Sequence, residues 1–335
     1  MPVSIKDIAK EAGVSPSTVS RALHDHPRIS SETKAYIQNL AKSMGYVPST
    51  VARNLVGKRT AAIGVAMADL TDPYYDRLMS GFEDAAATHG YQLVLSSFYR
   101  NPERELAIIH DFHKRRMDGI IVTGSSAIRT YQSSEHNFFM PIVLVNSPHY
   151  PFSVSTNGYL GAKQVVKHLT TLGHRRIAYV TWGTEHVDGA NRLSGYQSAL
   201  AEHNVPFDKT LVVSGDGGIT GGIKAVPNLF ELSQPPTAIF AFNDMTAIGV
   251  INALRQRNLE VPGHVSVAGY DDLEMASFYY PPLTTVRQPT YQVGKRAVNM
   301  LLRLIHGHSA EPEILEPELV VRDSTGPVRL GLSSI

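Results

Sequence analysis

The sequence predicts an α/β protein: an N-terminal three-helix headpiece containing a helix-turn-helix, followed by two doubly wound parallel-sheet subdomains. Three observations predict this fold class. The first 60 residues hold three short amphipathic helical patterns separated by turn residues. Beyond them, short apolar runs alternate with helical stretches, as in parallel sheets covered on both faces. These runs form two similar arrays, which begin near residues 62, 91, 119 and 141 and again near 176, 210, 238 and 265.

The first two predicted helices are short and closely spaced. Ser4 and Asp7 have the spacing of a capping box, and apolar residues at helical spacing lead to Gly13, which can end the helix in a left-handed conformation. Ser15 then places an N-cap hydroxyl before Pro16, which suits the first position of a second helix. Two helices joined by such a tight turn form a helix-turn-helix.

The outer face of the second predicted helix suits DNA. A third helix beginning at Ser30 can enclose a small core with the first two, so that Val19 and Ala22 turn inward. The outer side chains are short and polar apart from one arginine, whose guanidinium can bond bidentately to guanine in the major groove. A packing module without a DNA partner is the alternative. The candidate DNA-binding residues are Ser15, Pro16, Ser17, Thr18, Ser20, Arg21 and Arg28.

Charge is distributed unevenly along the chain. Residues 1–60 hold nine of the 31 Lys and Arg but four of the 30 Asp and Glu, which gives a net charge of +5, and residues 61–335 carry −4. A local basic segment most often serves a polyanion, although a solvated basic face is the alternative. We therefore expect double-stranded DNA as a partner of the N-terminal segment.

The segment 48–60 predicts a helix that forms only with a partner. It begins with a proline, contains about two turns of helix and ends in the basic run VGKRT, so it is too short to be stable alone in water. A plain interdomain linker is the alternative, but it would not need Leu55 exposed between Arg53 and Lys58.

Polar and aromatic side chains follow several predicted strands of the larger part. Ligands of parallel sheets bind outside the carboxyl ends of the strands, so the cleft between the two arrays is the expected pocket. Carboxylates and amides bond to hydroxyl groups, and aromatic rings cover the C–H face of a sugar. For two of the residues, Asp244 and Asp272, the alternative role is to hold loops by capping the helices that follow. The residues at the strand ends are Asp69, Asp72, Tyr74, Tyr75, Asn146, Trp182, Asn243, Asp244, Asp271 and Asp272.

The N-terminal sequence IKDIAKEAGVSPSTVSRALHDHPRIS and the segment PSTVARNL resemble the signature of the lactose/galactose repressor family. The motifs RLSGY at 192–196, NDMTAIGV at 243–250 and GYDD at 269–272 are also similar to that family. The resemblance implies that the second helix reads the major groove. It also implies that PSTVARNL is a hinge helix that folds on operator DNA, with Leu55 as a wedge in the minor groove and Ser49 and Ala52 beside it.

The resemblance further implies a core with the two-lobed, periplasmic-binding-protein-like fold. It implies effector contacts at Arg192, Asn243 and Asp271, and it suggests Tyr74, Tyr75 and Asn146. With Asp69 and Trp182 from the strand ends, these are the candidate effector-binding residues. Gly217 stands where several sugar-responding relatives carry an aromatic residue. The expected function is a sequence-specific transcriptional regulator, a repressor, whose affinity for its operator is controlled allosterically by a small carbohydrate.

Two-fold operators require a two-fold protein, and no C-terminal heptad run is present, so we expect a homodimer.

The expected domain boundaries follow from the two arrays and the resemblance. We expect a helix-turn-helix domain at 1–47, a hinge helix and linker at 48–60, and an effector-binding and dimerisation core at 61–335. Within the core, the N-subdomain is expected at about 61–158 and 290–319, and the C-subdomain at about 159–289 and 320–335.

Other function classes find little support in the sequence. The chain has no Cys, which excludes a thiolate nucleophile and any Cys-built metal site. The glycines of the segment 215–221 miss the dinucleotide-binding spacing by one place, His110 and His113 lack an acid in register, and GxSxG is absent. We therefore expect no enzyme activity, no cofactor and no metal. The solute-binding protein of a sugar transporter remains the alternative.

The expected location is the cytoplasm, without a membrane partner. The N-terminus lacks the apolar stretch of a signal peptide, and no run of about 18 uncharged apolar residues occurs. The missing signal peptide also argues against the transporter alternative.

Overall fold

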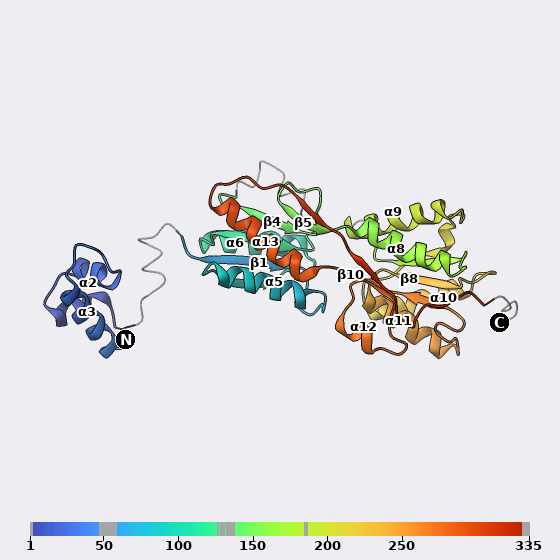
Figure 1. Ribbon diagram of the computed structural model, residues 1–335, viewed down its shortest axis with the longest axis horizontal. Coiled ribbons are helices and arrows are strands. Elements are labelled where there is room, and N and C mark those ends of the chain that lie inside the picture. The colour runs from blue at the N-terminus through green and yellow to red at the C-terminus, as the bar shows by residue number, and fades with distance from the viewer. Residues whose placement is uncertain are drawn as a thin grey trace. The chain divides into compact units, whose positions relative to one another are not determined.

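The fold class predicted from the sequence is confirmed (Figure 1). Residues 1–60 and residues 61–335 form separate compact units. The structure is a computed structural model that describes residues 3–46, 59–125, 127, 131, 138–183 and 187–329.

Three helices form the described part of the first unit, residues 3–46. Each begins after a serine N-cap, at Ser4, Ser15 and Ser30, whose hydroxyl accepts the backbone N–H of the residue three positions on. Ile8 and Ile37 are fully buried in the small core between the helices. The helices are α1 (Ile5–Ala12), α2 (Pro16–Leu23) and α3 (Ser31–Ser43).

A six-stranded parallel sheet forms the first half of the second unit, in the order β11-β5-β4-β3-β1-β2. Helices α5 (Tyr75–Thr88) and α13 (Thr290–Ile305) cover one face of this sheet, and α6 (Pro102–Lys114) covers the other. The strands are β1 (Ala62–Met67), β2 (Gln92–Ser97), β3 (Gly119–Thr123), β4 (Ile142–Val145), β5 (Ser153–Thr156) and β11 (Glu313–Leu315). We call this half the N-subdomain.

A four-stranded parallel sheet, in the order β7-β6-β8-β9, forms the other half, which we call the C-subdomain. Helices α8 and α9 pack on one face, and α10 and α11 pack on the other. The elements are α8 (Gly158–Thr171), β6 (Ile177–Thr181), α9 (Val187–Glu202), η1 (Lys209–Leu211), β7 (Val212–Ser214), α10 (Ile219–Phe230), β8 (Ala238–Ala241), α11 (Asp244–Gln256), β9 (Ser266–Ala268) and α12 (Glu274–Phe278).

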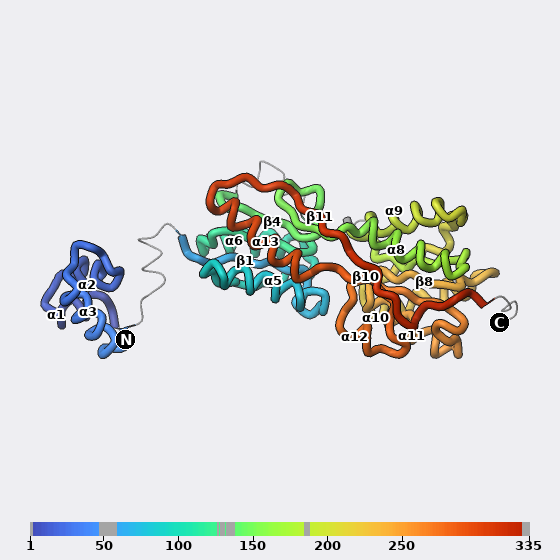
Figure 2. The backbone as a smooth tube through the Cα atoms, viewed as in Figure 1, coloured from blue at the N-terminus to red at the C-terminus, as the bar shows by residue number. Residues whose placement is uncertain are grey.

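The chain passes between the two sheets at 156–158, 287–290 and 315–318, and Figure 2 shows these passages as a tube. Strands β10 (Thr285–Arg287) and β12 (Glu318–Val320) pair antiparallel beside two of them. Strands β10, β11 and β12 were not predicted from the sequence, and neither was β5. They are short or polar, so no apolar periodicity marks them. The eight predicted strand starts, in contrast, lie within two residues of the observed ones.

Two negative findings apply to the described residues. None of their helices is both long enough and apolar enough to cross a membrane. Among the same residues, no group of three or more His, Asp or Glu side chains is arranged to hold a metal ion.

Candidate functional sites

Helix α2 presents a small polar surface to solvent. The hydroxyl of Ser15 accepts the Thr18 backbone N–H at 3.1 Å and pairs with the Ser17 hydroxyl at 2.7 Å, so it holds the start of the helix. Val19 is fully buried in the headpiece core, whereas Arg21 is exposed. The exposed guanidinium on a helix whose other face is buried is an arrangement that can enter a DNA groove.

The structure places the other predicted DNA-binding residues as follows. Pro16 and Arg28 are exposed, and Thr18 and Ser20 are half-buried. Ser49, Ala52 and Leu55, the residues of the expected hinge helix, lie outside the described residues.

The core contains a cavity of about 90 Å³ between its two subdomains. Seven of the eight predicted effector-binding residues line it, and the eighth, Asp69, is not among the described lining residues. The cavity lies at the carboxyl ends of the strands, as the fold class predicts. Its lining residues include Asp72, Tyr74, Tyr75, Arg100, Asn146, Trp182, Asp188, Arg192, Gly217, Phe242, Asn243, Asp271 and Gln288.

Asp69 is bonded within its own loop and is not among the residues that line the cavity. Its carboxylate accepts the backbone N–H of Thr71 at 2.9 Å and the Thr71 hydroxyl at 2.7 Å, and these bonds hold the pKa of Asp69 below its usual value despite partial burial. The short loop after β1 therefore uses Asp69 to fix its own backbone. Asp72, three residues on, lines the cavity, and burial raises its pKa.

Arg192 is the buried cation of the cavity. Its guanidinium carbon lies 4.2 Å from the ring centroid of Phe242 and 3.8 Å from that of Tyr270. One Nη donates to the Phe242 carbonyl oxygen, and the other lies 3.9 Å from Asp271 Oδ1. Its Nε is buried without a hydrogen-bond partner among the described residues. Two aromatic faces and the Asp271 carboxylate thus stabilise this cation, while its Nε–H has no acceptor among the described residues.

Asp271 faces Arg192 from a strained backbone. Its φ is 119°, a value that only glycine adopts readily. Burial raises the pKa of Asp271 well above its usual value, and the charge of Arg192 partly offsets this effect. The Gln288 side chain donates to Asp271 Oδ1 at 2.7 Å. The carboxylate is therefore held in one position at the cavity wall.

Two predicted residues of the N-subdomain bind each other. The Asn146 side-chain amide donates to the Tyr74 hydroxyl at 2.8 Å, and Asn146 has a φ of 58°, in the left-handed region. Burial raises the pKa of Tyr74 and of Tyr75, so both hydroxyls stay protonated at neutral pH. The Tyr74 hydroxyl can therefore still donate its proton to a ligand oxygen.

Asn243 lines the cavity, but its side chain already has two structural partners. Its Oδ1 accepts the Thr246 backbone N–H at 2.9 Å as the N-cap of α11, and its Nδ2 donates to the Gly217 carbonyl oxygen at 2.8 Å. Only the second lone pair of its oxygen and one amide hydrogen remain for a ligand. The sequence alone gave no means of separating the capping role from a ligand contact.

Trp182 supplies an aromatic surface to the cavity. The Arg100 guanidinium lies 4.3 Å from the Trp182 ring centroid, so a residue after β2 meets one after β6 across the cleft. The Phe242 ring packs edge-on at 5.4 Å. A Cβ at Gly217 would come within 3.1 Å of the indole. The missing side chain at Gly217 therefore leaves room for Trp182, which supplies an aromatic ring from another strand.

The sequence analysis did not select the lining residues Arg100, Asp188 and Gln288, and it named Asp72 only as a strand-end residue and not as an effector contact. Arg100 follows β2, so the rule that selected residues after strand ends could have found it. Asp188 precedes Arg192 by one helical turn on α9. Gln288 follows β10, which had no recognisable strand pattern.

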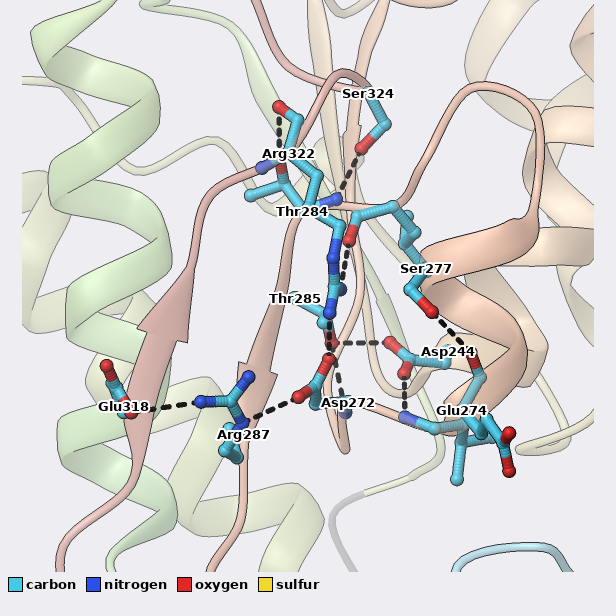
Figure 3. A network of polar contacts seen from close by, with 12 residues as sticks. Asp244, Asp272, Glu274, Ser277, Thr284, Thr285, Arg287, Glu318, Arg322 and Ser324 are labelled. Carbon is cyan, nitrogen blue, oxygen red and sulfur yellow. Dashed lines mark hydrogen bonds and ion pairs between the residues drawn. The ribbon is translucent and has the colours of Figure 1, made fainter.

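Neither Asp244 nor Asp272 caps the helix that follows it, because Asn243 is the N-cap of α11 and α12 has no side-chain cap, but both bind neighbouring segments through other hydrogen bonds. Asp244 is fully buried, and its carboxylate accepts the Leu273 backbone N–H and the Thr285 hydroxyl. Burial raises the pKa of Asp244 to about 7. Asp272 accepts hydrogen bonds from Arg287 and Arg322 (Figure 3).

Comparisons with known proteins agree with both parts of the chain. Residues 4–49 match the family "Bacterial regulatory proteins, lacI family", and residues 166–325 match the periplasmic binding protein-like domain. The HTH-type transcriptional regulator DegA of Bacillus subtilis is 33% identical over 340 residues, which span 98% of this chain and 99% of the relative.

Two solved structures resemble the fold over nearly the whole chain. The lac repressor dimer bound to operator and the anti-inducer ONPF has a TM-score of 0.88 and 28% identity, covering 97% of this chain and 100% of that one. The complex of the transcriptional regulator CelR with cellobiose has a TM-score of 0.74 and 28% identity, covering 96% and 99%. The chain therefore belongs to the lacI family of bacterial regulatory proteins, and it is a transcriptional regulator and not the solute-binding protein of a transporter.

Proposed function

We propose that this protein is a repressor that binds operator DNA as a homodimer. Its affinity for the operator falls or rises when a neutral saccharide binds in the core cavity. The observation that carries the proposal is the cavity lining, in which carboxylates and amides surround aromatic rings contributed by both subdomains. The proposal assigns the cavity to recognition and not to catalysis. It places the protein in the cytoplasm, with the DNA that it regulates.

The charges of the cavity favour a neutral ligand. Three carboxylates, Asp72, Asp188 and Asp271, line it with two guanidinium groups, Arg100 and Arg192. Arg192 already lies between two rings and beside Asp271, so little of its charge is available to an anion. A multiply charged phosphate would have to be desolvated beside three carboxyl groups, and no lysine is among the described lining residues.

Hydrogen bonding and ring contacts favour a hydroxylated ligand. The Arg192 Nε–H has no acceptor among the described residues, and a buried donor without a partner costs free energy that a ligand hydroxyl would recover. Trp182 and Phe242 offer apolar surface beside these polar groups, as sugar recognition requires. The similar CelR structure, which holds cellobiose, supports the same ligand class.

Three features support the DNA-binding half of the proposal. They are the exposed Arg21 on α2, the net charge of +5 in residues 1–60, and the similarity to an operator-bound lac repressor dimer. A single headpiece makes too few contacts for specific binding, so two copies on a two-fold operator form the proposed working unit. Arg21 is the proposed base-reading side chain, and Leu55 the proposed minor-groove wedge.

The single tryptophan of the sequence makes the ligand half testable. Because Trp182 lines the cavity, a molecule that enters it should change the tryptophan emission. Titration with cellobiose, ribose and glucose 6-phosphate should give a saturable change with a neutral sugar, and Asp271→Asn should weaken it. A response to glucose 6-phosphate alone would replace the neutral ligand with an anionic one. No response to any of the three sugars would contradict a saccharide of these types.

The DNA half needs a separate measurement. Selection of bound fragments from random duplex DNA should enrich a palindrome whose half-sites lie about one helical turn apart. Arg21→Ala should weaken recognition at one position of each half-site by about 1–3 kcal/mol. Retention of random fragments without enrichment would contradict sequence-specific binding, whatever the ligand result.

A further inference from the structure

Asp271 and Asp272 are neighbours with different partners. Asp271 lines the cavity and faces Arg192, whereas the Asp272 carboxylate receives hydrogen bonds from two arginines outside the cavity lining. Both residues have positive φ, at 119° and 54°. Two successive non-glycine residues in this region persist only where surrounding contacts hold them.

The contacts that hold Asp272 come from strand β10 and from the segment just after β12. Arg287 Nε of β10 donates to Oδ2 at 2.7 Å, and an Nη of Arg322, just after β12, donates to Oδ1 at 2.6 Å. Figure 3 shows the Asp272 carboxylate between these two guanidinium groups. The Asp272 side chain is only 10% exposed, so the ion pairs are partly shielded from water. Such pairs are stronger than those on an open surface.

The two residues that flank Arg287 bind the neighbouring Asp271. The Asp271 backbone N–H donates to the Val286 carbonyl oxygen at 2.8 Å, and the Gln288 side chain donates to Asp271 Oδ1 at 2.7 Å. Residues 271–272 are thus bonded to residues 286–288. The latter lead directly through the crossing at 287–290 into α13 of the N-subdomain.

We propose that Asp272 is a positioning residue of the effector site, which fixes Asp271 and Gln288 at the cavity wall and carries their displacement into the crossing segment. The inference rests on the proposed function, because it names a residue that acts on the same ligand site. In this role Asp272 does not touch the ligand. It acts because its two arginines hold a strained pair of residues against the strands that join the subdomains.

The alternative is that Asp272 only stabilises the fold. In that case, removal of the Asp272 carboxylate would lower the stability of the core but leave the sugar affinity and the effect of sugar on operator affinity unchanged. Asp208 provides a matched control, because it also pairs with an arginine, Arg176 at 3.4 Å, and caps Thr210, yet it does not line the cavity.

The test compares full-length Asp272→Asn, Arg322→Met and Arg322→Lys with Asp208→Asn. Trp182 emission gives the cellobiose and ribose affinities, and operator affinity is measured with and without each sugar. Asp272→Asn and Arg322→Met should weaken sugar binding about tenfold and shrink the effect of sugar on operator affinity by a similar factor. Arg322→Lys, which keeps the charge, should recover part of both losses. Asp208→Asn should change neither.

A measurement without ligand keeps the two proposals distinguishable. Hydrogen–deuterium exchange of peptides covering 269–273 and 286–290 should speed up about tenfold or more in Asp272→Asn, and not in Asp208→Asn, because the Asp271 amide is then held less firmly against the Val286 carbonyl oxygen. Unchanged exchange in these peptides would overturn the positioning role. Unchanged sugar affinity with reduced stability would overturn it as well. If no sugar binds even the unaltered protein, the saccharide proposal fails, and the exchange result alone decides the role of Asp272.

Discussion

Replacement of Arg192 by Met should destabilise the core strongly, because it leaves the Asp271 carboxylate buried without its counter-charge. The guanidinium lies 3.9 Å from Asp271 Oδ1. At an effective dielectric constant of about 20, this distance corresponds to an attraction of about 4 kcal/mol. The Phe242 and Tyr270 rings, at 4.2 and 3.8 Å, add about 1–2 kcal/mol each. The desolvation of the cation offsets part of this sum, so the expected net loss is about 3–5 kcal/mol.

Urea unfolding followed by Trp182 emission measures this loss, because the single tryptophan reports on the core and not on the headpiece. The double variant Arg192→Met/Asp271→Asn should regain about 2 kcal/mol or more, since the unpaired charge is then removed. The deficit of the single variant should also shrink as the pH falls. Asp271 has a raised pKa in the folded state, and without Arg192 this pKa rises further, so protonation at lower pH favours the folded form.

Two results would refute this reasoning. A loss of less than about 1 kcal/mol in Arg192→Met would mean that the pair is not shielded from water as its exposed side-chain fractions of 5% and 7% indicate. Additive effects of the two substitutions would mean that Arg192 and Asp271 do not interact energetically.

Three further predictions concern other parts of the chain. The folded-state pKa of Asp244 is about 7, against 3.8 for the free side chain, so its contribution to stability is fully present below about pH 3.8 and is lost as the pH rises through 7. Asp244→Asn should therefore flatten this part of the curve of stability against pH. An equally steep curve in the variant would exclude Asp244 as the source. Ser15→Ala should lower headpiece stability by about 1 kcal/mol through loss of the α2 N-cap. Circular dichroism should then show the headpiece helices melting at a lower temperature, whereas an unchanged transition would show that the cap is dispensable. Gly217→Ala should lower the free energy of unfolding by about 1 kcal/mol or more and shift the Trp182 emission, because the residue has φ +77° and its Cβ would meet the indole at 3.1 Å. An unshifted spectrum would contradict the contact.

The sequence located the main strands and the headpiece helices because their signals are local. A serine followed by a helical pattern fixes a helix start, and a buried parallel strand is a continuous apolar run. Strands β10 and β12 carry no such signal, since three residues with mixed polarity define no period. Their pairing depends on 30 or more residues of intervening structure, which local patterns do not encode.

The candidate cavity divides in the same way. The rule that parallel strands point their carboxyl ends at the ligand selected Trp182 and Asp271 from the sequence, because the position of a residue after a strand is a local property. The same rule also selected Asp69, whose carboxylate turns to its own loop instead.

The sequence by itself thus determined the fold class and which strand ends bear polar groups, since both depend on residues within one or two turns of the chain. Only the tertiary structure decided what each polar group does. Asp271 and Asp272 are identical neighbours in sequence, yet one meets Arg192 of α9 and the other meets Arg322, 50 residues later. Partners this distant are brought together by the packing of both sheets and their crossings, and a side chain's charge state and role follow from the partners it meets there.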